Sequence, residues 1–160
     1  MGTKQSFLSA KELAGIVDER FPALLLYAQS WNTHDAEDLV QNAFLKLAEQ
    51  PKRPENPAAW LCKTIRNAAI SQYRKAERQR KYETEAVRHK PDWFEPRDPL
   101  LAREAAEKLA ELPADKREIV VLRIWNQLSF DEIAELTNTP KTSVFRMYSD
   151  ALAELKKKLT

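Results

Sequence analysis

Residues 129–146 read SFDEIAELTNTPKTSVFR and predict two helices joined by a short turn. Ser129, followed three residues later by Glu132, is a capping box, which begins a helix. Asn138 stands in the turn, where it tolerates the left-handed backbone that such a turn often needs. The pair Thr139–Pro140 then gives an N-cap and a proline at the first position of a longer helix. The stretch therefore predicts a helix-turn-helix.

A helix-turn-helix that binds DNA places the N-terminal end of its second helix in the major groove. In this chain that end would present Lys141, Thr142, Ser143 and Arg146. A plain helical hairpin with solvated polar residues fits the same pattern, because helix pairs with short turns are common. The motif alone therefore leaves both DNA binding and a structural role open.

The residues before the motif predict two more helices of the same domain. Asp98 and Pro99 begin one that runs to about Leu109, and Pro113 separates it from the next. That next helix carries an apolar stripe, which we expect in the core, made of Ile119, Val120, Leu122 and Trp125.

The N-terminal part of the chain predicts three helices. The first, at about 10–30, follows a second capping box, and the second, at about 35–50, carries a single apolar stripe. The third begins at Asn56–Pro57, an N-cap with a proline behind it, and runs to about residue 81. Trp60 falls on its apolar stripe, so we expect this side chain in the core.

Between residues 82 and 97 the helical pattern gives way to charges and prolines, which is typical of a linker. The chain has only 2 glycines and is 43% hydrophobic, a composition that favours helices over sheets. We therefore expect an all-α protein of two small helical domains, residues 1–81 and 98–160, joined by a flexible linker at 82–97.

The net charge of +2 says little about partners, but the charge is unevenly distributed. Residues 63–81 hold seven positive side chains and one negative, whereas residues 35–49 hold four negative and one positive. Neighbouring helices of opposite charge indicate two different partners. The basic side chains Arg74, Lys75 and Arg78 gather with Lys81 on one side of a helix. A phosphate-binding face and an ordinary solvated face both have this pattern.

Two further features are each compatible with two roles. Tyr73 lies at the edge of the basic cluster, where its ring could stack on an unpaired base or be partly buried as an amphipathic side chain. The carboxylates at 35–38 would stabilise the positive end of a helix. A basic protein partner would account for them as well.

The sequence gives little support to a secreted protein, a membrane protein, a metal-binding protein or an enzyme. Cys62 is the only cysteine, so the chain forms no internal disulfide, and we expect a reduced, cytoplasmic setting. The longest apolar run, Ala23–Ala28, is too short to cross a membrane. His34 and His89 stand in no metal or nucleophile motif, and there is no glycine-rich phosphate loop. We therefore expect no enzyme activity, no metal and no cofactor.

Three stretches resemble the extracytoplasmic-function sigma factors of bacterial RNA polymerase. Region 2 of that family is similar to DAEDLVQNAFLKLAEQ at 35–50 and AWLCKTIRNAAISQYRKAER at 59–78. Region 4 is similar to ELPADKREIVVLRIWNQLSFDEIAELTNTPKTSVFRMYSDALAELKKKL at 111–159. The stretches follow the family's order, with a linker where the family has one. The resemblance implies a protein that joins RNA polymerase, recognises promoter DNA and initiates transcription.

The resemblance also implies where each partner binds. The clamp helices of the polymerase's largest subunit would contact Asp35, Glu37, Asp38, Gln41 and Phe44. The −10 element, with a flipped base near Asn67, would contact Arg66, Asn67, Ser71, Arg74, Lys75 and Arg78. The −35 element would contact Lys141, Thr142, Ser143, Phe145 and Arg146. Region 4 would also touch the polymerase flap.

The chain departs from the family in two places. Ser71 stands where an acidic residue is usual, and Thr142, Phe145 and Asp150 stand where a glycine and several basic residues are usual. Residues 110–160 hold eight positive and eight negative side chains. Because DNA affinity rises with the number of phosphates neutralised, a neutral region 4 is poorly suited to strong −35 binding.

We therefore expect a sigma factor whose partners are core RNA polymerase and promoter DNA, without membrane insertion. A helix-turn-helix regulator that binds DNA alone is the alternative from a different class, and a small helical hydrolase is a third. The sequence leaves open whether an anti-sigma protein controls the chain.

Overall fold

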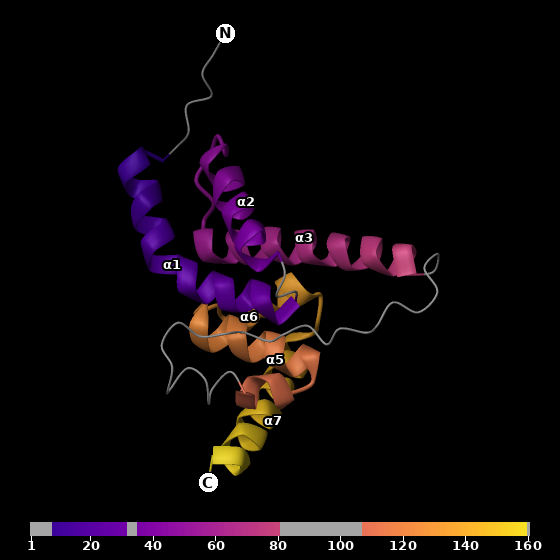
Figure 1. Cartoon of the computed structure of the whole chain (residues 1–160). Helices are drawn as coiled ribbons and strands as arrows, with labels where there is room; N and C mark the ends of the chain where they lie inside the picture. Colours follow the sequence, from indigo (N-terminus) through magenta and orange to yellow (C-terminus); the bar gives the residue numbers. More distant parts are fainter. Residues whose placement is uncertain (1–7, 32–34, 81–106, 160) are drawn as a thin grey trace. The chain divides into compact units, whose positions relative to one another are not determined.

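The computed structural model describes residues 8–31, 35–80 and 107–159. The chain divides into two compact units, Met1–Asp92 and Trp93–Thr160, and all regular structure in the described residues is helical (Figure 1). The predicted linker at 82–97, Lys81 and the predicted helix start at Asp98–Pro99 lie outside the described residues, as do His34 and His89. The expectation of an all-α protein is confirmed.

The first unit is built from α1 (Ala10–Trp31), α2 (Ala36–Ala48) and α3 (Pro57–Arg80), each of which packs against the other two. The predicted cap of α1 is present, since the backbone N–H of Glu12 donates to the Ser9 hydroxyl at 3.1 Å. Pro22 lies inside α1, and the helix changes direction along its length (Figure 1). A proline in a helix interior removes one backbone hydrogen bond and bends the helix.

Helix α2 buries one face and exposes the other. It begins one residue after the predicted start, and the predicted apolar stripe is buried throughout: Leu39, Val40, Ala43, Phe44 and Leu47. The helix ends two residues before the predicted end, where the backbone N–H of Glu49 is shared between the carbonyls of Leu45 and Lys46. Shared bonds of this kind are usual where a helix tightens before it stops.

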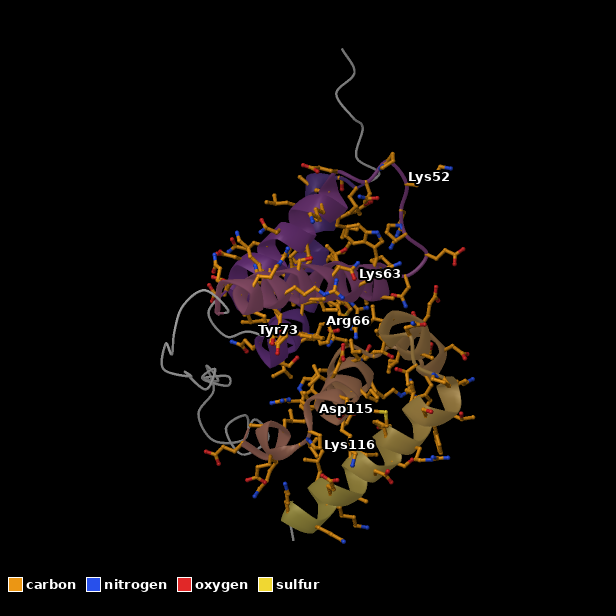
Figure 2. The ribbon with its side chains drawn as sticks, turned by 90° about the vertical axis from the view of Figure 1, so that its right-hand side faces the viewer. Lys52, Lys63, Arg66, Tyr73, Asp115 and Lys116 are labelled. Atoms are coloured by element: carbon orange, nitrogen blue, oxygen red, sulfur yellow. The ribbon has the colours of Figure 1, made fainter. Side chains whose placement is uncertain are left out.

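One face of helix α3 is buried along its first half, and its second half is mostly exposed. The side chain of Asn56 accepts the backbone N–H of Ala59 at 3.3 Å, which confirms the predicted N-cap. Core positions are Ala58, Leu61, Cys62, Ile65 and Ala69. The C-terminal part of the helix projects past α1 and α2 (Figure 1), and Figure 2 labels three side chains of this helix, Lys63, Arg66 and Tyr73.

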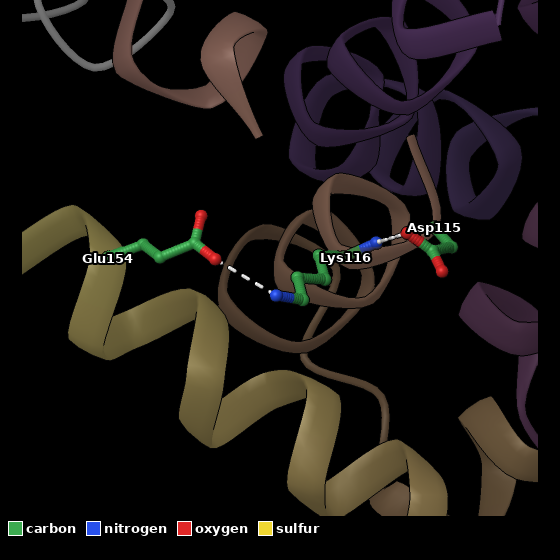
Figure 3. Close-up of polar contacts among 3 residues, drawn as sticks. All are labelled: Asp115, Lys116 and Glu154. Carbon is green, nitrogen blue, oxygen red and sulfur yellow. Dashed lines mark hydrogen bonds and ion pairs between the residues drawn. The ribbon is translucent and has the colours of Figure 1, made fainter. Parts of the chain in front are cut away.

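The second unit consists of a helical turn at 107–111, α5 (Ala114–Val120), η1 (Val121–Trp125), α6 (Phe130–Thr137) and α7 (Lys141–Leu159). Its core is formed by Leu109, Leu112, Ile119, Val120, Val121, Leu122, Leu128, Ile133, Val144 and Ala151. The Nζ of Lys116 on α5 lies 2.9 Å from a carboxylate oxygen of Glu154 on α7 (Figure 3). This hydrogen bond raises the pKa of Lys116 and lowers that of Glu154, as expected of a pair that fixes two helices together.

The expectation that Trp125 is a core residue is wrong. Its side chain is 37% exposed, because η1 is a π-helical turn rather than a continuation of α5. The backbone N–H of Asn126 donates to the carbonyl of Val121, five residues back, and this wider turn changes which residues face the core. Asn126 is buried instead, and its side-chain amide also donates to the carbonyl of Val121. The other tryptophan expected in the core, Trp60, is only partly buried.

Two further observations concern the described residues. No helix within 8–31, 35–80 or 107–159 has the combination of length and apolar character that a membrane span requires. In the same stretches, no three His, Cys, Asp or Glu side chains are gathered as a metal ion would need.

Candidate nucleic-acid interface

The helix-turn-helix has the predicted local geometry. The hydroxyl of Ser129 accepts the backbone N–H of Glu132 at 3.1 Å, and the Glu132 carboxylate accepts that of Ser129 at 2.9 Å, so the capping box is complete. Asn138 follows α6 in the left-handed conformation, with φ 52° and ψ 44°. The backbone N–H of Thr139 then donates to the carbonyl of Ala134, which closes the turn.

The second helix of the motif begins slightly later than predicted. The carbonyl of Pro140 accepts the backbone N–H of Val144 at 3.0 Å, so Pro140 occupies the N-cap and α7 starts at Lys141. The hydroxyl of the predicted cap, Thr139, donates to the carbonyl of Thr137 at 3.2 Å.

The predicted −35 contacts lie together at the start of α7. Lys141, Thr142, Phe145 and Arg146 are all exposed, and Ser143 is partly buried. Positions four apart on a helix are neighbours, so the four exposed side chains form one surface. Lys141 is paired within the motif, because its Nζ lies 3.0 Å from a carboxylate oxygen of Asp131 at the start of α6.

An aromatic cluster that the sequence did not indicate supports this surface. The ring of Phe130 meets Phe145 edge to face, with centroids 5.6 Å apart, and meets Tyr148 in the same manner at 5.3 Å. The guanidinium of Arg123 lies 4.5 Å from the Phe130 ring centroid and donates to the carbonyl of Leu128. These side chains come from η1, α6 and α7, and only the folded motif brings them together.

The predicted −10 contacts extend along α3. Those that are exposed are Asn67, Ser71, Arg74, Lys75 and Arg78. Arg66 is partly buried, and its guanidinium lies 5.5 Å from the ring centroid of Trp31 at the end of α1. Such a cation–π contact holds the arginine against the unit. Tyr73, also labelled in Figure 2, is 59% exposed, which contradicts the alternative of a partly buried tyrosine.

The acidic face of α2 differs from the prediction at one residue. Asp35, Glu37, Asp38 and Gln41 are exposed, and Asp35 makes no side-chain hydrogen bond to cap the helix. Phe44 is only 6% exposed and belongs to the core, because it lies on the apolar stripe that packs against the other helices. The exposed apolar side chain of this helix is Leu45, at 63%.

The chain combines a three-helix unit that carries a basic helix with a second unit that carries a helix-turn-helix, an arrangement that fits a DNA-binding protein. The chain matches the family model of sigma-70 region 2 over residues 23–79 and that of sigma-70 region 4 over residues 102–155. It therefore belongs to the sigma-70 family of RNA polymerase sigma factors, in the extracytoplasmic-function branch. Its function is promoter recognition and transcription initiation.

Individual relatives agree with this assignment. The chain is 31% identical over 133 residues to the RNA polymerase sigma factor SigV of Bacillus subtilis (strain 168), covering 76% of each. It is 26% identical over 136 residues to the extracytoplasmic-function sigma factor SigW of the same organism, covering 75% of this chain and 73% of SigW. The expectation of a sigma factor is confirmed, and the alternative, a regulator that binds DNA alone, is not favoured by these matches.

Solved structures share the fold. The sigma factor RpoE of Bartonella quintana, in complex with the anti-sigma factor NepR, gives a TM-score of 0.70 at 27% identity over 94% of this chain and 98% of RpoE. CnrH, in complex with the cytosolic domain of CnrY, gives a TM-score of 0.59 at 24% identity over 94% of this chain and 89% of CnrH.

The left-handed turn residue gives a test of the motif. Asn138→Gly should leave the stability of α6 and α7 nearly unchanged, whereas Asn138→Val should destabilise them by about 1–2 kcal/mol, because a branched side chain is strained at positive φ. Hydrogen exchange of the full-length chain would measure the free energy of opening in both helices. Asn42→Val, at an exposed position inside α2, is the matched control and should have a much smaller effect on its own helix. Equal effects at Asn42 and Asn138 would contradict the assigned turn.

Proposed function

We propose that the chain directs bacterial RNA polymerase to promoters by dividing the work among three exposed helix faces. The acidic face of α2 binds core polymerase, the basic face of α3 binds the −10 element, and the start of α7 binds the −35 element. The observation that carries this proposal is the pairing of oppositely charged, outward faces within the first unit, in a chain that matches both sigma regions.

On α2, charge and apolar surface lie next to one another. Asp38, Gln41 and Leu45 are spaced three and four residues apart, so they share one side of the helix. Carboxylates steer a basic partner, and the exposed Leu45 adds apolar area to the contact. Phe44 is buried beneath this surface, in the core. In the proposed contact with the clamp helices of polymerase, the apolar residue is therefore Leu45 and not Phe44.

On α3, polar and basic residues form one stripe. Asn67, Ser71, Arg74 and Arg78 are spaced four, three and four residues apart, and all four side chains are exposed. The amide and the hydroxyl can pair with base edges, and the two arginines can hold phosphates. Lys75 lies next to the stripe and adds positive charge. The contact of Arg66 with Trp31 suits it to orienting α3 rather than to reaching a distant phosphate.

The second unit contributes less charge. Lys141, Thr142, Ser143, Phe145 and Arg146 are proposed to face the −35 element, and other parts of the unit to contact the polymerase flap. We keep the proposed domains at 1–81 and 98–160, with 82–97 as the linker between them. Specific recognition then depends on both units, because each binds DNA weakly by itself.

The remaining parts of the proposal follow from this role. Acting with polymerase, the chain is a cytoplasmic regulator that uses the catalytic site of its partner and needs no enzyme activity, metal or cofactor of its own. The relative RpoE was solved with an anti-sigma factor, and this supports control of the present chain by a protein of that kind.

The function is tested by transcription in vitro. The chain, added to core polymerase with a library of genomic fragments, should give transcripts that start at a small set of sites with shared upstream sequences. Sequencing the transcript starts, with core polymerase alone as the control, would reveal those elements. Transcripts that start at the same sites with and without the chain would contradict the proposal.

The polymerase contact is tested by reversing a charge on α2. Asp38→Lys should weaken binding to core polymerase by about tenfold or more, because like charges then meet across the interface. Glu49→Lys makes the same change in net charge just beyond the end of α2 and should bind nearly as well as the parent. Circular dichroism would confirm equal helicity. Equal affinities for the Asp38 and Glu49 variants would exclude the acidic face as the contact.

The −10 contact is tested at the amide on α3. Asn67→Ala should weaken open-complex formation by about 1–3 kcal/mol on promoters with the preferred base and much less on promoters with another base there. Gln79→Ala removes another exposed amide from the same helix and serves as the control. A loss of the same size on every promoter variant would assign Asn67 a structural role.

A further inference from the structure

Phe145 is an exposed aromatic residue on the surface that α7 is proposed to present to DNA. Its side chain is 57% exposed, although it stands beside Lys141, Thr142 and Arg146 on the polar side of the helix. The buried side of α7 is formed by other residues, Val144 and Ala151 among them, so the core does not require a large apolar side chain here.

The ring of Phe145 is held in place by the motif itself. It meets Phe130 edge to face at a centroid distance of 5.6 Å and an interplanar angle of 77°. Phe130 is fixed in turn by Tyr148 and by Arg123, whose guanidinium is tied to the carbonyl of Leu128. An aromatic ring supported in this way loses little conformational entropy when it binds.

The charges around Phe145 favour recognition over simple phosphate binding. The Nζ of Lys141 lies 3.0 Å from a carboxylate oxygen of Asp131, so a negative charge stands beside this positive one. Residues 129–149 hold three acidic and two basic side chains, so this part of the motif has no excess of positive charge. An exposed apolar group is then the most distinctive feature that the surface offers to DNA.

We infer that Phe145 is a specificity-determining residue that reads thymine in the −35 element by contact with its 5-methyl group. In the major groove thymine is the base that presents a methyl group, and apolar side chains, phenylalanine included, recognise it by direct contact. The neighbouring Thr142 carries a methyl group on the same surface and can extend the contact. The inference rests on the proposed function, because it places the start of α7 in the major groove.

The test uses the full chain with core polymerase and a promoter whose transcript start has been mapped. Each thymine of the −35 element is replaced in turn by deoxyuridine, which removes only the methyl group. For the parent chain, one or two of these replacements should weaken binding by about fourfold, the value of one buried methyl group. Phe145→Ala should weaken binding to the thymine promoter by a similar factor and should no longer respond to deoxyuridine.

Two further variants separate loss of the methyl contact from loss of the fold. Phe145→Leu keeps an apolar side chain and should retain part of the response to deoxyuridine, which a misfolded chain would not. Leu152→Ala removes another exposed apolar side chain from α7 and should respond to deoxyuridine as the parent does. Circular dichroism of each variant would establish that helicity is unchanged.

The outcomes separate the inference from the function on which it rests. The inference is overturned if the −35 element contains no thymine, if the parent is indifferent to every replacement, or if Phe145→Ala keeps the full response. A third outcome is also possible: the parent does not respond to the methyl group, and Phe145→Ala weakens binding to every promoter variant by the same factor. This outcome would also overturn the inference and would indicate that Phe145 contacts a protein instead. A chain that directs no transcript starts would contradict the proposed function itself, and the inference with it.

Discussion

Each helix of these small units has one face in the core, and this burial fixes the direction in which its other face points. In α2, Leu39, Val40 and Leu47 are buried, so the carboxylates of the first turn face solvent. In α3, Leu61 and Ile65 are buried, so the amide and basic residues project from the opposite side. The same apolar packing that stabilises the first unit therefore orients both of its charged surfaces.

Local features of the structure could be predicted from the sequence, because they depend on a few neighbouring residues. The capping box at Ser129 and the left-handed Asn138 are of this kind, and both are present. The spacing of Trp125 predicts a core position. A π-helical turn changes which residues face the core, and no local sequence pattern predicts such a turn. The contact of Arg66 with Trp31 joins helices far apart in sequence, so only the folded unit reveals it.

The proposal that each unit binds DNA weakly by itself has a consequence for how the chain works. Residues 110–160 of the second unit carry no net charge, and Lys141 at the start of α7 is already paired with Asp131. Two weak contacts give specific binding when a rigid partner holds them at a fixed spacing, because the second contact then forms within one complex. Such tethering can raise the overall affinity by about 10²–10⁴ without any new interaction. Polymerase would supply that spacing, and apolar recognition at Phe145 would add selectivity without adding general affinity for DNA.

The central claim is that specificity arises only when polymerase holds both units. Fluorescence anisotropy of a labelled promoter duplex, at near-physiological salt, would compare the free chain with the complex of chain and core polymerase. The account predicts that the free chain binds weakly and does not distinguish the promoter from a scrambled duplex, while the complex does. Tight and sequence-specific binding by the free chain, at about 10⁻⁸ M or better as is typical of independent DNA-binding regulators, would contradict it.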